Sequence, residues 1–503
     1  MIALSPQSLA RSLKRESSRS SRSSRRNCTV SILVCLALLS GCSAVGPDYK
    51  KPSLVTPNQW KIEPGWRQAI PMDQAIKGRW WEIFGDDDLN RLEYQTLASN
   101  NNLAIAQARL DQARAQTASA NSSLLPRLGL TAGSSRSRNS ADRPISQQGQ
   151  VWSGPVQQSD FNAALNVSYE LDLAGRVRRQ IEGAKATEQQ IASDFENTKL
   201  ILTAQLAVSY FSLRELDTEI SLVKEILGSQ KRALNFVSSR YELGASSQLD
   251  VEQQRALMSG TESQLQNLVD QRSKFEHAIA TLTGVAASNF SIAESANLPT
   301  PPQVPLVQPA QLLERRPDIA SSERAVAAAN AQIGVAKAAY FPTLNLGEVY
   351  GSDANNRNLL FSTPALLWSV GLSATQTLYD AGRTEAGVNA AKAANTQAVA
   401  AYKQTVLNAF EEVENSLSTQ KSLLDASKSL SVAVKSSKNA WSLSQARYEA
   451  GASNQLEFLL SQQTYLGYAR QEVQNKGQQL LNTVLLVKAL GGGWNSENAD
   501  PKN

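Results

Sequence analysis

The sequence predicts a mainly α-helical protein in which long helical hairpins, built as a tandem duplication, are combined with membrane-crossing β-strands. Three observations predict this fold class. A short motif recurs at an offset of 207 residues, long helix-forming segments surround each copy, and a period-two alternation of apolar residues interrupts each half. In a chain of 503 residues, such a period indicates one fold built twice rather than several unrelated domains.

The repeated motif runs from Ser239 to Gln254 and again from Ala446 to Ser461, and eight of its first thirteen positions are identical. In each copy Arg-Tyr-Glu closes a helix and Gly244 or Gly451 supplies the backbone freedom of a C-terminal cap. A serine or asparagine that follows can cap the next helix. Each copy is therefore predicted to be the tight tip of an antiparallel helical hairpin.

The N-terminal region is typical of an export signal. Residues 1–41 combine a Ser/Arg-rich start, an apolar core from Val30 to Leu39 and a small-residue end. The core, at about ten residues, is too short to span a bilayer. The end resembles the bacterial lipoprotein box, in which Cys42 is lipidated and becomes the mature N-terminus; an ordinary signal without lipidation is the alternative. Cys42 is then the only cysteine of the mature chain, so no intramolecular disulfide is expected.

The formal charge of +5 comes from this predicted export signal. Residues 1–41 carry seven basic residues and one acidic residue, and removing their net +6 leaves −1 for the rest of the chain. A basic surface for nucleic acid is therefore not expected.

The chain then passes through a proline-rich arm, residues 42–78, into helical sequence that begins at Arg79. Asp86-Asp87-Asp88 precedes the helix that carries Leu89, and no further residue at ligand spacing accompanies the three carboxylates. We therefore interpret them as an acidic helix N-cap rather than a metal site.

From Phe161 to Leu173 apolar residues occupy the odd-numbered positions and mostly polar residues the even-numbered ones. Leu128, Leu130 and Ala132 begin a partner strand, and a polar loop follows it through Gln158. A half-buried strand of a soluble sheet fits the alternation equally well. A transmembrane strand is favoured because its length suits a bilayer and very long helices flank it in an exported chain. The odd-numbered residues are then predicted to face lipid and the even-numbered ones the lumen. In the second half Trp368, Val370, Leu372 and Ala374 alternate in the same way.

Helix lengths predict how each repeat is built. Arg176 to Arg240 contains no proline and would form a helix of about 95 Å. The return helix, Leu249 to Thr283, would measure about 55 Å, and the helix that enters the strands, Leu103 to Ser123, about 35 Å. Stacked end to end, the two shorter helices match the long one, so each repeat is predicted to be a rod two helices wide. Apolar residues at a seven-residue spacing form its expected seam, at Leu206, Leu213, Ile220 and Leu227.

The predicted organisation is a signal peptide (1–41), a lipid-anchored extended arm (42–78), two structural repeats and a C-terminal tail (494–503). The first repeat (79–310) contains a β-hairpin at about 127–173 and a tip at 240–250. The second repeat (311–493) contains a β-hairpin at about 343–380 and a tip at 447–457.

Together, Cys42, "WWEIFGDDDL", "LLERRPD", "IGVAKAAYFP", the paired "AGR" turns and the paired tips resemble the outer-membrane factors of Gram-negative efflux and secretion systems. This is the TolC-like family, and the resemblance favours its lipidated, OprM-like branch. It implies a homotrimer in which four strands per chain close a twelve-stranded outer-membrane β-barrel above a periplasmic α-helical tunnel. The implied function is a passive exit duct that works with a periplasmic adaptor and an inner-membrane pump.

The resemblance also assigns roles to the tips. In this family a tyrosine of the second tip and acidic residues on the next helix close the channel, and Tyr448 and Glu457 match two of these positions. Leu460 stands where the family often has Asp, so Leu456 and Leu460 are expected to give a more apolar constriction. Residues of both tips are expected to dock the adaptor, namely Tyr241, Gly244, Asp250 and Gly451.

Two other function classes fit the sequence less well. An enzyme is disfavoured because His277 is the only histidine and no metal-ligand set accompanies it, so neither a cofactor nor a metal is expected. A structural coiled-coil periplasmic lipoprotein without a pore would explain the helices and the anchor. It would not explain strand pairs at matching places in both halves.

Overall fold

The structure, a computed structural model, describes residues 44–54, 56–57, 60–61, 79–140, 142, 145–147, 150–152, 157–302, 304, 313 and 315–492. The predicted signal peptide, Cys42 and the tail 494–503 lie outside these residues. The chain divides into two compact units. Of the described residues, one unit comprises 44–50 and those within Ala115–Ala186 and Ala327–Gln397, and the other comprises the rest. Each sequence repeat contributes to both units, so the repeats are not separate compact domains.

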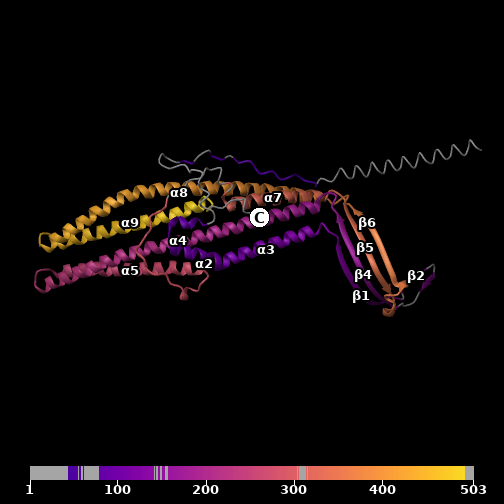
Figure 1. Ribbon diagram of the computed structural model, residues 1–503, viewed down its shortest axis with the longest axis horizontal. Coiled ribbons are helices and arrows are strands. Elements are labelled where there is room, and N and C mark those ends of the chain that lie inside the picture. The colour runs from indigo at the N-terminus through magenta and orange to yellow at the C-terminus, as the bar shows by residue number, and fades with distance from the viewer. Residues whose placement is uncertain are drawn as a thin grey trace, which may run out of the picture. The chain divides into compact units, whose positions relative to one another are not determined.

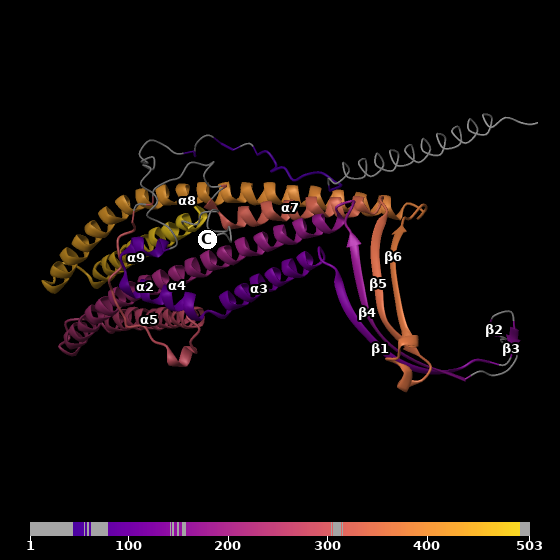
Figure 2. The ribbon, with the colours of Figure 1, turned by 45° about the vertical axis from the view of Figure 1, so that its right-hand side comes forward.

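The first unit contains a four-stranded antiparallel sheet (Figure 1). Its order is β1-β4-β5-β6, so the central pair joins the two repeats and β1 and β6 are the edges. Figure 2 shows the four strands side by side, with a separate short hairpin of β2 and β3 beyond their ends. The strands are β1 (Arg127–Arg138), β2 (Ile145–Gln147), β3 (Gln150–Trp152), β4 (Gln157–Leu171), β5 (Thr343–Ala354) and β6 (Leu366–Thr375).

The pairing register gives this sheet one largely apolar face. Opposite residues form a row across all four strands at Leu130, Leu165, Tyr350 and Trp368. These four side chains are 44 to 74% exposed in the subunit. The neighbouring row, which contains Asn166, belongs to the other face and also holds Gly129, Ser369 and one apolar residue, Val349. Glu348, opposite Val167, is a charged exception on the apolar face.

The alternation predicted for β4 and β6 is confirmed, whereas the ends of the strands differ from the prediction. β1 continues through polar sequence to Arg138, because backbone pairing to β4 does not require apolar side chains. β4 begins at Gln157 and ends at Leu171, so Leu173 does not belong to the strand. The backbone N–H of Leu173 donates to the carbonyl of Leu171 at 2.8 Å, which turns the chain toward the next helix.

Three helices of the first repeat have counterparts of equal length in the second repeat. α4 and α8 each have 67 residues, α5 and α9 each have 35, and α3 and α7 each have 22. None of the described helices is long and apolar enough to cross a membrane. The helices are α2 (Asp87–Ser99), α3 (Asn101–Ser122), α4 (Arg176–Glu242), α5 (Gln248–Leu282), α7 (Pro317–Ala338), α8 (Arg383–Glu449) and α9 (Gln455–Ala489).

The core of the second unit forms along the predicted seam of α4. Leu206, Leu213 and Ile220 are at most 1% exposed. The run Asp86-Asp87-Asp88 lies at the start of α2, whose Leu89 belongs to this core. Asp86 caps the helix by accepting a hydrogen bond from the N–H of Leu89 at 2.9 Å. The interpretation of this run as an N-cap is therefore confirmed. His277, on α5, is exposed.

Hydrogen bonds at the helix ends confirm the predicted end-to-end stacking. The carbonyl of Leu282, the last residue of α5, accepts a hydrogen bond from the side-chain amide of Asn100, directly before α3, at 2.7 Å. In the second repeat the carbonyl of Ala489, the last residue of α9, accepts one from Arg316, directly before α7, at 3.1 Å. Arg316 is held by Asp318 and Glu412, so its buried charge is paired.

Candidate functional site

Both helical tips lie in the second unit and have the same turn. In the first, Gly244 has a φ of +71° and the N–H of Ala245 donates to the carbonyl of Arg240 at 2.7 Å. In the second, Gly451 has a φ of +72° and the N–H of Ala452 donates to the carbonyl of Arg447 at 2.8 Å. This left-handed C-cap explains the glycine of each copy, and both predicted turns are confirmed.

The helices that leave the tips are capped by different residues. Asn454 accepts a hydrogen bond from the N–H of Glu457 at 2.9 Å. In the first tip Ser247 and Asp250 form a reciprocal capping box, and Ser246 donates a further hydrogen bond to the Asp250 carboxylate. Burial raises the pKa of Asp250, but the hydrogen bonds from Ser247 and Ser246 outweigh this effect and the pKa is lowered overall. The carboxylate of Asp250 is thus already engaged within its own tip.

Tyr448 is half-buried between the two hairpins of one subunit. Its ring stacks on Phe458 with a centroid separation of 5.5 Å and an interplanar angle of 6°. It also meets the edge of Phe236, on α4, at 6.2 Å, and the guanidinium of Arg240 lies 5.7 Å from the ring centroid. The equivalent tyrosine of the first tip, Tyr241, is 46% exposed. The duplication therefore places identical residues in different surroundings.

Gln455 joins the two tips directly. Its side chain is buried, and its Nε2 donates to the carbonyl oxygen of Asp250 at 2.7 Å. The hydroxyl of Tyr448 donates to Oε1 of the same glutamine at 3.4 Å. Sequence reasoning missed this residue. The only available signal was the identical glutamine at Gln248 in the first copy, and Gln248 is exposed.

Glu457 does not present an unpaired charge. Its carboxylate lies 3.3 Å from Nη1 of Arg447, and both side chains are about half-exposed. An exposed ion pair of this kind contributes little to stability, but it reduces the negative charge that Glu457 offers to its surroundings. Leu456 and Leu460, one helical turn apart, are 54% and 55% exposed.

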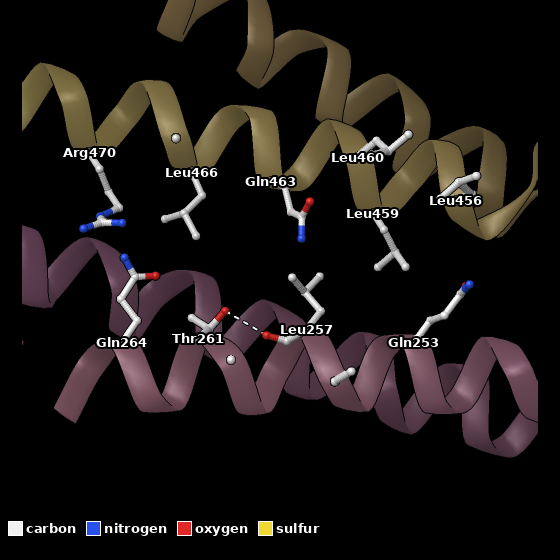
Figure 3. A pocket seen from close by; sticks show the side chains of 13 residues that line it. Gln253, Leu257, Thr261, Gln264, Leu456, Leu459, Leu460, Gln463, Leu466 and Arg470 are labelled. Atoms are coloured by element: carbon white, nitrogen blue, oxygen red, sulfur yellow. Dashed lines mark hydrogen bonds between the residues drawn. The ribbon is translucent and has the colours of Figure 1, made fainter. Parts of the chain in front are cut away.

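Leu456 and Leu460 also line a groove between α5 and α9, shown in Figure 3. The groove has a volume of about 680 Å³. At its other end lies Arg470, whose Nε is 2.6 Å from the buried carboxylate of Glu219. The rest of the lining consists of apolar or small side chains, three amides and one hydroxyl: Gln253, Ala256, Leu257, Gly260, Thr261, Gln264, Leu459, Gln463, Leu466 and Gly467. Thus the structure brings Leu456 and Leu460 together along one groove, whereas Tyr448 packs between the hairpins.

The first tip exposes an apolar surface that sequence reasoning did not include. Leu243 is 83% exposed and Leu249 is 65% exposed, on either side of the turn at Gly244. The corresponding positions of the second tip are Ala450 and Leu456. A leucine in a turn motif carries no signal of its own, because exposure depends on which neighbours pack against it.

Comparisons with known proteins agree with this arrangement. The family model of outer membrane efflux proteins matches residues 92–285 and 308–492. The probable efflux pump outer membrane protein TtgC of Pseudomonas putida is 32% identical over 474 residues, which cover 92% of this chain and 95% of that protein. The pyoverdine export outer membrane protein OpmQ of Pseudomonas aeruginosa is 31% identical over 470 residues, with coverages of 92% and 97%.

Comparisons with solved structures also find outer-membrane channels. The outer-membrane channel OprN superimposes with a TM-score of 0.80 at 29% identity, covering 90% of this chain and 99% of that one. The open state of the MtrE outer membrane channel of Neisseria gonorrhoeae gives a TM-score of 0.77 at 25% identity, with coverages of 90% and 99%. The fold described above is thus shared with known outer-membrane channels over 90% of the chain. The chain belongs to the outer membrane efflux protein family and is an outer-membrane channel component of an efflux system.

Proposed function

We propose that three copies of this chain form one channel, in which their sheets close a twelve-stranded barrel and their helices form a periplasmic tunnel. The observation that carries this proposal is the four-stranded sheet, which has an exposed apolar face and two edges, β1 and β6. Open edges are not tolerated in a lipid bilayer, so the sheet requires neighbours on both sides. The apolar row through Leu165 then faces lipid and the row through Asn166 faces the lumen.

In this proposal the second tip closes the periplasmic end. Three copies of Tyr448, Leu456, Glu457 and Leu460 gather around the threefold axis. The exposed Leu456 and Leu460 supply apolar surface for the closed constriction. Glu457 supplies a weaker negative charge than an unpaired acid, because Arg447 accompanies it.

The contacts between the hairpins hold this end closed. Opening requires the hairpin of α8 and α9 to swing away from α4 and α5. That movement breaks the hydrogen bond from Gln455 to Asp250 and the contact between Tyr448 and Phe236. A partner favours the open state only if it binds that state more tightly. We assign this role to a periplasmic adaptor.

The adaptor docks on the tips, and an inner-membrane pump delivers the exported compound. The turns at Gly244 and Gly451 and the exposed Tyr241 form the proposed docking surface, with Leu243 and Leu249 as its apolar part. Asp250 contributes through the shape of its capped helix rather than through a free carboxylate. The duct itself performs no chemistry and uses neither a cofactor nor a metal.

We further propose that Cys42 is lipidated and anchors the chain to the outer membrane. Since the barrel of the trimer is itself held in the membrane, the lipid is a second anchor. A Cys42→Ser variant exported with a different signal should therefore still assemble. Complete loss of the barrel in that variant would contradict the anchor's supporting role.

Conductance of the purified protein in planar bilayers tests the proposed function. A trimeric duct should give discrete, cation-preferring single-channel steps, and the steps should grow when the tips are loosened. A structural lipoprotein without a pore should give none. Absence of steps from both the native chain and a tip-loosened variant would refute the channel.

A further inference from the structure

In the first unit, a groove lies between the C-terminal end of α7 and the first turns of α8. Its volume is about 460 Å³. Lys337 and the following Tyr340 and Phe341 form the α7 side, and residues at helical spacing form the α8 side. We call it the α7–α8 groove; it is lined by Val45, Lys337, Tyr340, Phe341, Glu385, Val388, Asn389 and Lys392.

The groove combines positive charge with apolar surface. Lys337 and Lys392 face it from the two helices, and Glu385 is the single carboxylate in the lining. Neither ammonium group forms an ion pair with another residue in the described part of the chain. The net charge of the lining is thus +1. Tyr340 and Phe341 are 49% and 45% exposed, although large aromatic side chains are usually packed.

The groove lies next to the ends of the strands that are proposed to cross the membrane. Phe341 is two residues before Thr343, where strand β5 begins. In the connection from β6 to α8, Leu378 and Tyr379 are 94% and 87% exposed. Exposed aromatic residues at the ends of membrane strands typically lie at the level of the lipid headgroups. Val45, which lines the groove, follows three residues after Cys42 in the sequence, the residue proposed above to carry the lipid.

We propose that the α7–α8 groove binds the phosphate of an anionic phospholipid from the periplasmic leaflet of the outer membrane. Lys337 and Lys392 bind the phosphate oxygens, and the first part of the acyl chains lies against Tyr340, Phe341 and Val388. Lysine suits this role because its long apolar stem packs along the groove while its ammonium group reaches the headgroup layer. The proposal depends on the outer-membrane location of the chain and not on the gate or the docking surface.

Quantifying lipid bound to the purified trimer, by native mass spectrometry from nanodiscs, tests the proposal. Nanodiscs that contain phosphatidylglycerol and phosphatidylcholine in equal amounts serve as the probe. The native chain should retain phosphatidylglycerol preferentially. A lysine near an anionic headgroup changes affinity about fivefold, so Lys337→Gln with Lys392→Gln should weaken retention about thirtyfold. Glu385→Gln should strengthen it, because the lining then carries a higher positive charge.

Matched controls separate this site from general surface charge. Lys403 and Lys438 are exposed lysines of α8 outside the groove, so their double Gln variant should retain phosphatidylglycerol as the native chain does. If the double groove variant fails to assemble, the exposed Lys392→Gln alone should still show about a fivefold loss.

Three outcomes would overturn the proposal. Equal retention of the two lipids would mean that the phosphate charge is not recognised. Displacement of the lipid by millimolar inorganic phosphate would make the groove a site for a free anion. Retention that rises in Cys42→Ser, and that the two lysine substitutions change only in that variant, would assign the groove of the native chain to the acyl chains of the anchor itself.

Discussion

Replacing Tyr448 and Gln455 together by alanine should release the second helical hairpin from the first. The double substitution removes the hydrogen bond to the carbonyl of Asp250, the contact with the ring of Phe236 and the contact with the Arg240 guanidinium. All three connect one hairpin to the other within a subunit. The capped turn at Gly451 is left intact, so the tip should still fold.

The size of the effect follows from these contacts. The partly buried hydrogen bond from Gln455 to Asp250 contributes about 1 kcal/mol. The edge-on ring contact contributes about 0.5–1.5 kcal/mol, and the partly exposed cation–π contact about 0.5–1 kcal/mol. Their sum, about 2–3.5 kcal/mol per subunit, corresponds to a shift of about 30- to 300-fold toward the open state.

Single-channel recording in planar bilayers measures this shift as longer or larger open events. The duplication provides a matched control, because Tyr241 and Gln248 occupy the same motif positions and are exposed. Replacing them by alanine should leave the conductance near that of the native channel. If both double variants behave alike, or if the Tyr448 and Gln455 variant stays closed, the contacts between the hairpins do not hold the gate.

Other predictions concern the charged core and the sheet. Burial, with a smaller effect of neighbouring Glu219, raises the pKa of Glu215 from its ordinary value of 4.5 to about 7. The Glu215 carboxyl group therefore contributes its full stability below pH 4.5, and this contribution is lost as the pH rises through about 7. In thermal unfolding measured against pH, Glu215→Gln should remove about 1–2 kcal/mol of this pH dependence. Asp217→Ala should destabilise the protein by about 3–5 kcal/mol, measured by thermal unfolding. The substitution leaves the buried guanidinium groups of Arg214 and Arg272 without the carboxylate that they share. Leu165→Arg should lower barrel stability in lipid by about 2–4 kcal/mol, whereas Asn166→Arg should be tolerated; equal losses would refute the proposed register.

The sequence predicted the elements of this fold well, because their signals are local. Proline-free length and the glycine at the turn predicted the helix that begins at Arg176 and its return helix, and the structure has both. The alternation in β4 was equally direct, since a strand exposes successive side chains to opposite faces. The ends of β1 and β4 were less well predicted, because polar residues at a strand end pair through backbone groups that leave no side-chain pattern.

The sequence alone therefore determined the duplication, the two turns and the family resemblance, because each is carried by short motifs that can be recognised without knowing what they contact. Only the tertiary structure decided what the duplicated residues contact. Tyr448 and Tyr241 share the same motif, yet one packs against Phe236 and the other is exposed. Gln455, in the second tip, donates a hydrogen bond to the first tip, whereas its counterpart in the first tip, Gln248, is exposed. The physical reason is that a hairpin's surroundings are set by the packing of the other hairpin, and that packing joins residues about 200 positions apart, beyond the reach of any local pattern.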